Sequence, residues 1–410
     1  MEISSDLTNL MIKMTNALRL SGYSEITIIK FKAVFKRIGK AFQDEGCRTY
    51  EDVFWKHYGN RTAAMIREGR WKLGAIEYFD ATGDLPDGTR RSRIGVTTRY
   101  DRLSDDFKTM VDYYRESEAN RGITASTIRT TASNGICFLV ALQEQGIRRP
   151  EQITAGPVAD YFCTNDGMPM KSGSLRKNLL MFFRACSPIL PEGMADRIIG
   201  FIPEISCIRK NIQYLHEEEI AKVSRVLLDG RSDLTERNRA IGLLAMYAGL
   251  RSCDITGLLL TDIDWNNDTL LVSQQKTGRP LTLPLPAVLG NAIYDYIQHE
   301  RPEATVAEVF LTKTPPYRRM ASGDCYAIAS LIMDRAGIRV KGGDRRGLHV
   351  FRHHLATGML AQSVPAVVIS KVLGHSSPES TRAYLSADFA HLKECSLSIE
   401  EFPVRKGVLE

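Results

Sequence analysis

The sequence lacks paired cysteines. Its eight cysteines lie far apart and show no CxxC spacing. Disulfide scaffolds are short and dense in cysteine, so this pattern argues against a disulfide framework. We therefore expect reduced thiols and a cytoplasmic protein.

Long hydrophobic runs are also missing. No stretch approaches the roughly 20 apolar residues of a transmembrane helix. The first residues, MEISSDLTNLM, lack the basic start and apolar run of a signal peptide. With 410 residues, 43% of them apolar and 25% charged, the chain has the composition of a soluble protein of two or three domains. The net charge of +6 is compatible with nucleic acid but does not establish it.

Four strings in the second half carry polar residues of the kind that act on phosphates. The strings are AGLRSCDI (248–255), QQKTGRP (274–280), LHVFRHHLATGML (348–360) and LGHSSPESTRAYL (373–385). Residues 237–249 have the pattern of an apolar helix closed by Gly249, so Arg251 should open the next short helix. Asp254 follows one turn later, where it can orient Arg251 or a histidine.

The other strings have equally definite local settings. Residues 269–283 alternate as a strand, a Thr277-Gly278 turn and a second strand, which predicts Lys276 at a hairpin tip. His349 and Arg352 are one helical turn apart. Gly374 suits a helix C-terminus before His375, and Ser377 with Pro378 suits the start of a helix that carries Tyr384.

Taken in order, the four strings resemble the catalytic signature of the tyrosine recombinases, the integrase family. The residues that carry the resemblance are Arg251, Lys276, His349, Arg352, His375 and Tyr384, with Asp254 in support. The resemblance covers about residues 213–390. It implies an enzyme that breaks and rejoins DNA through a covalent 3′-phosphotyrosine, without a metal, ATP or another cofactor.

The chemistry explains why such residues are needed. Arg251 and Arg352 offer forked, permanently charged donors for the non-bridging oxygens of a phosphodiester. A tyrosine has a pKa of about 10, so Tyr384 must lose its proton during attack or lie in a strongly positive field. His349 or His375 can accept that proton, and Lys276 can protonate the departing 5′-oxygen. His353 and His354 also occur here, but only His349 and His375 fall on the family's motif positions.

Other interpretations remain open at this point. His349 and His353 have the spacing of metal ligands on a helix, but no Glu follows His349, so the zinc-protease pattern fails. A type IB topoisomerase uses nearly the same constellation and relaxes supercoils as a monomer. A third hypothesis is that the chain is a non-catalytic DNA-binding relative of these enzymes. Among recombinases, the chain fits a mobile-element integrase or transposase, with a chromosome-dimer-resolving recombinase as the alternative.

The first half contains an internal repeat. Residue n aligns with residue n+100 without gaps from GYSEITIIK (22–30) to AFQDEGCRTYEDV (41–53). Identical pairs include Gly22/Gly122, Thr27/Thr127 and Gly46/Gly146. The second copy resembles the helical core-binding domain of the recombinases. The first copy is then a duplicate that either packs or dimerises, or else grips additional DNA.

These observations predict a mainly α protein with two helical, core-binding-like (SAM-like) modules before an α+β catalytic domain with a small hairpin sheet. The expected domains are 1–85, 104–190 and 212–410, with linkers at 84–103 and 188–212. Basic residues on the first module and in the linkers are candidate DNA contacts, because phosphate neutralisation releases counterions. They are Lys30, Lys36, Arg37, Arg90, Arg91, Arg93, Arg209 and Lys210.

The resemblance also implies partners. It predicts double-stranded recombination sites, a tetramer of protomers on two synapsed sites, and accessory DNA-bending or directionality proteins. It also implies association with the nucleoid. The tail, 386–410, has an apolar series that fits docking on a neighbouring protomer or packing on its own domain.

Overall fold

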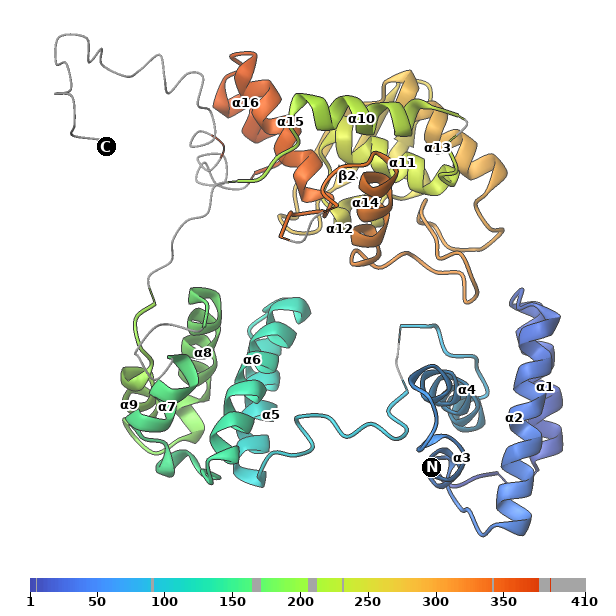
Figure 1. Ribbon diagram of the computed structural model, residues 1–410, viewed down its shortest axis with the longest axis vertical. Coiled ribbons are helices and arrows are strands. Elements are labelled where there is room, and N and C mark those ends of the chain that lie inside the picture. Colours follow the sequence, from blue (N-terminus) through green and yellow to red (C-terminus); the bar gives the residue numbers. More distant parts are fainter. Residues whose placement is uncertain are drawn as a thin grey trace. The chain divides into compact units, whose positions relative to one another are not determined.

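The chain is built from helices with one small sheet in the computed structural model (Figure 1). The structure describes all residues except 5, 90–91, 164–170, 206–211, 231, 341–342, 376–383 and 385–410. Contacts divide the chain into two compact units, residues 1–92 with 210–410, and residues 93–209. No helix in the described part of the chain is both long and apolar enough to cross a membrane. The predicted fold class, mainly α with a small hairpin sheet, is confirmed.

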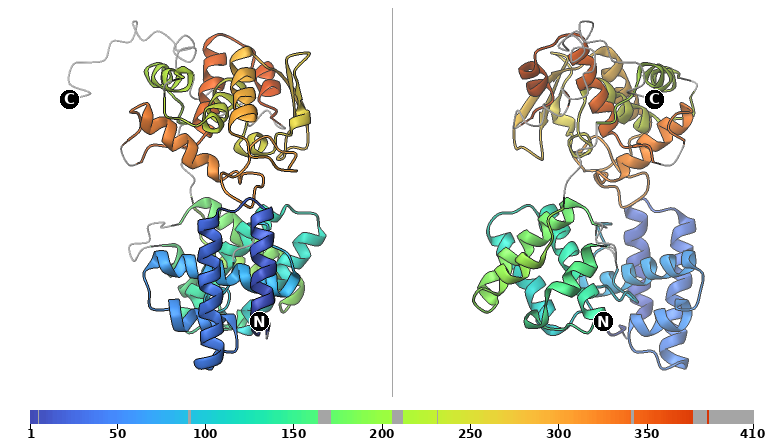
Figure 2. Two further views of the ribbon diagram at one scale, coloured as in Figure 1. Left: turned by 90° about the vertical axis from the view of Figure 1, so that its right-hand side faces the viewer. Right: turned by 60° about the vertical axis from the view of Figure 1, so that its left-hand side comes forward.

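Four helices make up the first module. They are α1 (Leu7–Leu20), α2 (Glu25–Asp44), α3 (Tyr50–Tyr58) and α4 (Ala63–Thr82). The side chains of Ser24, Thr49 and Thr62 each accept a hydrogen bond from a backbone N–H in the first turn, which fixes where three of these helices begin. α1 and α2 lie side by side (Figure 2). Ile28 and Phe31, one turn apart on α2, are buried in this module.

The second unit is also helical. Its helices are α5 (Asp105–Asn120), α6 (Ala125–Glu144), α7 (Ala155–Phe162), α8 (Gly173–Cys186) and α9 (Met194–Phe201), with short 3-10 turns at Pro150–Gln152 and Ser187–Ile189. Its core centres on Tyr114, Phe138, Phe182 and Phe183. The expectation of a linker over 188–212 is wrong for its first half, because α9 buries Ile198 in this core.

The two helical modules share local detail. α2 and α6 have bounds that differ by 100 residues at both ends. Each begins at a hydroxyl cap, Ser24 or Thr124, and each cap contacts the threonine three residues later. The glycines that precede these caps, Gly22 and Gly122, have φ values of 78° and 73°, a conformation that favours glycine. The sequence repeat therefore corresponds to a repeat of helix ends and turns.

The C-terminal part places a three-stranded antiparallel sheet among helices. Its helices are α10 (Glu217–Leu228), α11 (Glu236–Leu243), α12 (Ser252–Thr256), α13 (Ala287–His299), α14 (Asp324–Arg335), α15 (His349–Ala361) and α16 (Ala366–Val372). A π-helical turn, Leu244–Ala248, follows α11, and a 3-10 turn, Leu260–Asp262, precedes the sheet. The strands are β1 (Ile263–Asp264), β2 (Thr269–Ser273) and β3 (Pro280–Pro284), in the order β1-β2-β3.

Predicted local settings in this part agree with the structure in most places. Arg251 caps the start of α12, and Lys276 lies in the turn between β2 and β3. Gly374 follows α16 with a φ of 60°. The π-helical turn was not expected from the sequence. The predicted helix start at Ser377 and Pro378, and the tail, lie outside the described residues.

Candidate active site

Arg251 is held at the end of a chain reversal. The π-helical turn ends at Gly249, whose φ of 60° allows the backbone to turn into α12. Arg251 Nη2 donates to the Gly374 carbonyl at 3.5 Å, and Nη1 lies 3.7 Å from Asp254 Oδ2. Among the described residues, these last two atoms are buried without a hydrogen-bond partner. An unsatisfied guanidinium donor is therefore available for a ligand.

Asp254 links Arg251 to the hairpin. It is only 2% exposed, and its Oδ1 accepts a hydrogen bond from the Gln275 backbone N–H at 2.9 Å. The same carboxylate faces Arg251, which lies one turn earlier at the start of α12. A buried carboxylate needs such partners, so Asp254 fixes the Lys276 turn relative to Arg251.

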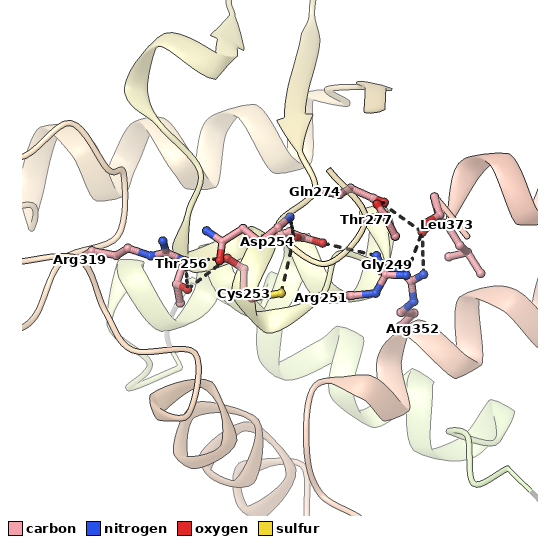
Figure 3. Close-up of polar contacts among 12 residues, drawn as sticks. Gly249, Arg251, Cys253, Asp254, Thr256, Gln274, Thr277, Arg319, Arg352 and Leu373 are labelled. Carbon is pink, nitrogen blue, oxygen red and sulfur yellow. Dashed lines mark hydrogen bonds and ion pairs between the residues drawn. The ribbon is translucent and has the colours of Figure 1, made fainter. Parts of the chain in front are cut away.

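Arg352 comes from α15 and is almost fully buried. Its Nη1 donates to the Gly249 carbonyl at 2.7 Å and its Nη2 to the Leu373 carbonyl at 2.6 Å (Figure 3). Burial and the neighbouring Arg251 lower the pKa of Arg352 to about 10, so the side chain stays charged at neutral pH. The two carbonyls hold the guanidinium plane in one orientation.

Gln274 ties the hairpin to the turn after α16. Its side chain is 1% exposed; Nε2 donates to the Leu373 carbonyl at 3.3 Å, and Oε1 accepts from Thr277 Oγ1 at 2.7 Å (Figure 3). Lys276 lies between Gln274 and Thr277 in the sequence, and it is exposed. The Leu373 carbonyl thus serves both Gln274 and Arg352, which connects the lysine turn with the buried arginine.

Tyr384 is buried among histidines. Its side chain is 3% exposed, and His353 Nδ1 lies 3.1 Å from its hydroxyl oxygen. The His375 ring lies parallel to the tyrosine ring, with centroids 6.0 Å apart. Burial raises the pKa of Tyr384 above its usual value, while Arg352 and Arg251 act in the opposite direction. The pKa values of His353 and His375 fall to about 4 through burial and neighbouring positive charge.

A pocket of about 290 Å³ opens beside the two arginines. Arg251, Arg352 and His349 line it, together with Ser252 and Tyr326. Burial, with Arg345 and Arg339 nearby, lowers the pKa of His349. Two guanidinium groups beside a small pocket make a site suited to a phosphodiester anion.

The sequence of this chain also matches known proteins. The profile of the Phage integrase family matches residues 213–391. The integrase/recombinase y4gC of Sinorhizobium fredii is 35% identical over 182 residues, which cover 43% of this chain and 92% of y4gC. The chain belongs to the phage integrase family, the tyrosine recombinases, which cleave and rejoin DNA.

Further matches agree with this tyrosine recombinase assignment. The integrase/recombinase y4rA of the same organism is 35% identical over 178 residues, 43% of this chain, and the chain spans only 42% of y4rA. The structure of XerH site-specific recombinase bound to difH substrate matches with a TM-score of 0.51 at 16% identity, over 84% of this chain and 94% of XerH. At that identity the second match supports the fold alone.

The structure of this recombinase brings most of the motif residues together. Arg251, Arg352 and His349 share the pocket, and His375 packs on Tyr384. The histidine that contacts the tyrosine hydroxyl is His353, whereas the sequence favours His349 and His375. The signal was present, because His353 lies one turn after His349 on the same helix, but spacing alone did not show which imidazole faces Tyr384.

The structure describes four of the eight candidate DNA contacts. Lys30 and Lys36 are exposed on α2, and Arg93 is exposed at the start of the second unit. Arg37 lies over the Tyr58 ring and donates to its hydroxyl at 2.5 Å, so its guanidinium is partly engaged within the module. The other four candidates, Arg90, Arg91, Arg209 and Lys210, lie outside the described residues.

Proposed function

We propose that Tyr384 is the nucleophile of this recombinase and that Arg251 and Arg352 hold the DNA phosphate it attacks. The observation that carries the proposal is the buried Tyr384 hydroxyl beside two guanidinium groups that border one pocket. Attack forms the Tyr384–phosphorus bond and breaks the bond to the 5′-oxygen. The product is a 3′-phosphotyrosine with a free 5′-hydroxyl.

The arginines stabilise the charge that gathers on the non-bridging oxygens. Arg352 is already fixed on two carbonyls, so little of its freedom is lost when a phosphate arrives. Arg251 contributes the unsatisfied Nη1. Donors positioned in this way contribute on the order of 10²–10³ in rate each. Asp254 supports Arg251, and His349 lines the same pocket as the two arginines.

Lys276 is assigned the role of general acid for the 5′-oxygen. It lies at an exposed turn whose base is tied to the site through Gln274 and Asp254. A lysine on such a turn can reach a leaving group while its backbone stays fixed. His375 packs against the nucleophile and lies near both arginines. Because the phosphotyrosine conserves the phosphodiester bond energy, rejoining needs no ATP.

The partner under this proposal is a pair of double-stranded recombination sites, with a tetramer of protomers and accessory proteins as the family resemblance implies. XerH was solved on its difH substrate, and y4gC and y4rA carry integrase/recombinase names, which supports a DNA site and an integrase or recombinase. We assign the mobile-element role because of the added N-terminal module. We assign the first module, with exposed Lys30 and Lys36, to additional DNA contact. The second unit, residues 93–209, is assigned to binding of the core recombination site.

Covalent trapping tests the proposed function. Wild-type and Tyr384→Phe protein are incubated with nicked duplexes from the flanks of the gene. A protein–DNA adduct that survives boiling in detergent, forms in EDTA and is absent from the variant is the expected result. The phenyl ring keeps the packing and removes only the hydroxyl, so DNA affinity should be unchanged. Cleavage retained by Tyr384→Phe would refute the assignment of the nucleophile.

A further inference from the structure

The hydroxyl of Tyr384 has a defined neighbour. His353, in the second turn of α15, places Nδ1 3.1 Å from the tyrosine oxygen, and the ring centroids are 5.4 Å apart. Both side chains are largely shielded from water, since Tyr384 is 3% exposed and His353 is partly buried. A proton leaving this hydroxyl therefore needs an acceptor from the protein rather than from bulk solvent.

We propose that His353 is a catalytic residue that accepts the proton of Tyr384 during DNA cleavage and returns it during rejoining. The inference rests on the proposed function and adds a residue to it. In the forward step the tyrosine oxygen bonds to phosphorus, its proton moves to His353 Nδ1, and the bond from phosphorus to the 5′-oxygen breaks. Lys276 supplies the proton that the 5′-oxygen gains, so atoms and charges balance.

The tautomer follows from this role. Nδ1 can accept a proton only if the neutral ring carries its hydrogen on Nε2, so the proposed role requires the Nε2–H tautomer of His353. In the free protein this neutral form is favoured, because burial and the charges around the ring lower the pKa of His353 to about 4. The groups that face it are His349, Arg352, Arg345 and His375, and the tyrosine itself.

Bound DNA should raise the pKa of His353 and so make it a better proton acceptor. A phosphodiester in the pocket lined by Arg251, Arg352 and His349 brings a negative charge next to the cations that depress the basicity of His353. Opposite charge favours the protonated imidazole, so the pKa of His353 rises when the substrate is bound. Tyr384 keeps a raised pKa through burial and is not ionised beforehand. Proton transfer is thereby linked to the presence of the phosphate.

His354 provides a matched control on the same helix. Its Nδ1 contacts the Leu215 carbonyl at 2.9 Å, away from the tyrosine. His353→Asn keeps a polar group near the position of Nδ1 and can hydrogen-bond the hydroxyl, but it cannot take up a proton at neutral pH. His354→Asn makes the same chemical change one residue away. His353→Gln is a second variant in case the asparagine substitution perturbs folding.

The experiment measures single-turnover adduct formation on a nicked duplex by full-length protein, between about pH 6 and pH 9, around the ordinary pKa of histidine. General-base catalysis contributes ~10²–10⁴ in rate, and we expect a loss of that size for His353→Asn near neutral pH. Without the base the tyrosine must ionise first. The rate of the variant should therefore rise by about tenfold per pH unit and approach the wild-type rate at high pH.

DNA affinity and the thermal midpoint should match those of wild type, and His354→Asn should cleave normally. Three results would overturn the proposal: a His353→Asn rate close to wild type, a loss that is the same at every pH, or full activity in His353→Gln. The last would show that a hydrogen bond is sufficient. A wild-type protein that forms no adduct would instead refute the proposed function, so the two failures are distinguishable.

Discussion

Gln274 gives a sharp test of how the lysine turn is positioned. Its buried amide joins Thr277, in the turn, to the Leu373 carbonyl, which also receives Arg352. Gln274→Leu keeps the size of the side chain and removes both hydrogen bonds. The backbone of the hairpin remains closed, because Gly278 N–H still donates to the Gln274 carbonyl at 2.8 Å.

The structure sets the size of the effect. Each neutral hydrogen bond contributes about 0.5–1.5 kcal/mol net, which gives about 1–3 kcal/mol for two bonds. The lower half of that range is expected here. The Leu373 carbonyl keeps its hydrogen bond from Arg352, and the half-buried Thr277 hydroxyl can hydrogen-bond to water. Cleavage should suffer more than stability. A shift of about 1 Å at a catalytic group costs on the order of 10² in rate, and Lys276 lies two residues from Gln274.

The assay compares two substrates. One has the ordinary 5′-oxygen at the scissile phosphate, and the other has a bridging 5′-sulfur, which leaves without a proton. Gln274→Leu and Lys276→Ala should both be slow on the first substrate and within about threefold of wild type on the second, a difference below 1 kcal/mol. Gln275→Leu is the control, since only its backbone N–H contacts Asp254. An equal loss on both substrates would show that Gln274 acts through Arg352 instead of the lysine.

Two further predictions concern the turns and the first module. Gly374→Ala should lower the free energy of unfolding more than Gly278→Ala, as measured by denaturant titration. Both glycines have positive φ, but a Cβ at Gly374 would lie 1.9 Å from Gln274 Nε2, whereas a Cβ at Gly278 would meet open space. The clash at Gly374 adds about 1–3 kcal/mol to the loss of stability. Equal losses of unfolding free energy in the two variants would contradict this prediction. Lys30→Ala with Lys36→Ala should weaken DNA binding and reduce its log–log salt slope by about 0.9 per lost phosphate contact, with adduct chemistry unchanged. An unchanged slope would favour a packing role for the module.

Local sequence rules were sufficient for most helices and for the hairpin. Hydroxyl caps such as Ser24 and Thr124, and left-handed glycines such as Gly374, act within a few residues, so their signals are readable from the chain. The sequence does not reveal the π-helical turn before Arg251, because its pattern is that of an ordinary apolar helix. The sequence predicts a linker at α9 because prolines and glycines flank this short apolar helix, which is stabilised by packing on the core of the second unit.

The sequence by itself determined which residue types are available and on which kind of element each one lies. Arg251, Lys276, Arg352 and Tyr384 were identified as candidates in that way. The mildly basic composition and the repeat likewise followed from the chain alone.

Only the tertiary structure decided which of these groups meet. The Arg352 guanidinium donates hydrogen bonds to the carbonyls of Gly249 and Leu373, which lie 103 and 21 residues away in the sequence. The Gln274 side chain donates to the Leu373 carbonyl, 99 residues away. Such contacts depend on burial of the shared core rather than on any local preference. The same holds for His353: sequence spacing puts it on one helix with His349, but which of the two imidazoles faces the tyrosine hydroxyl depends on how α15 is rotated against its neighbours.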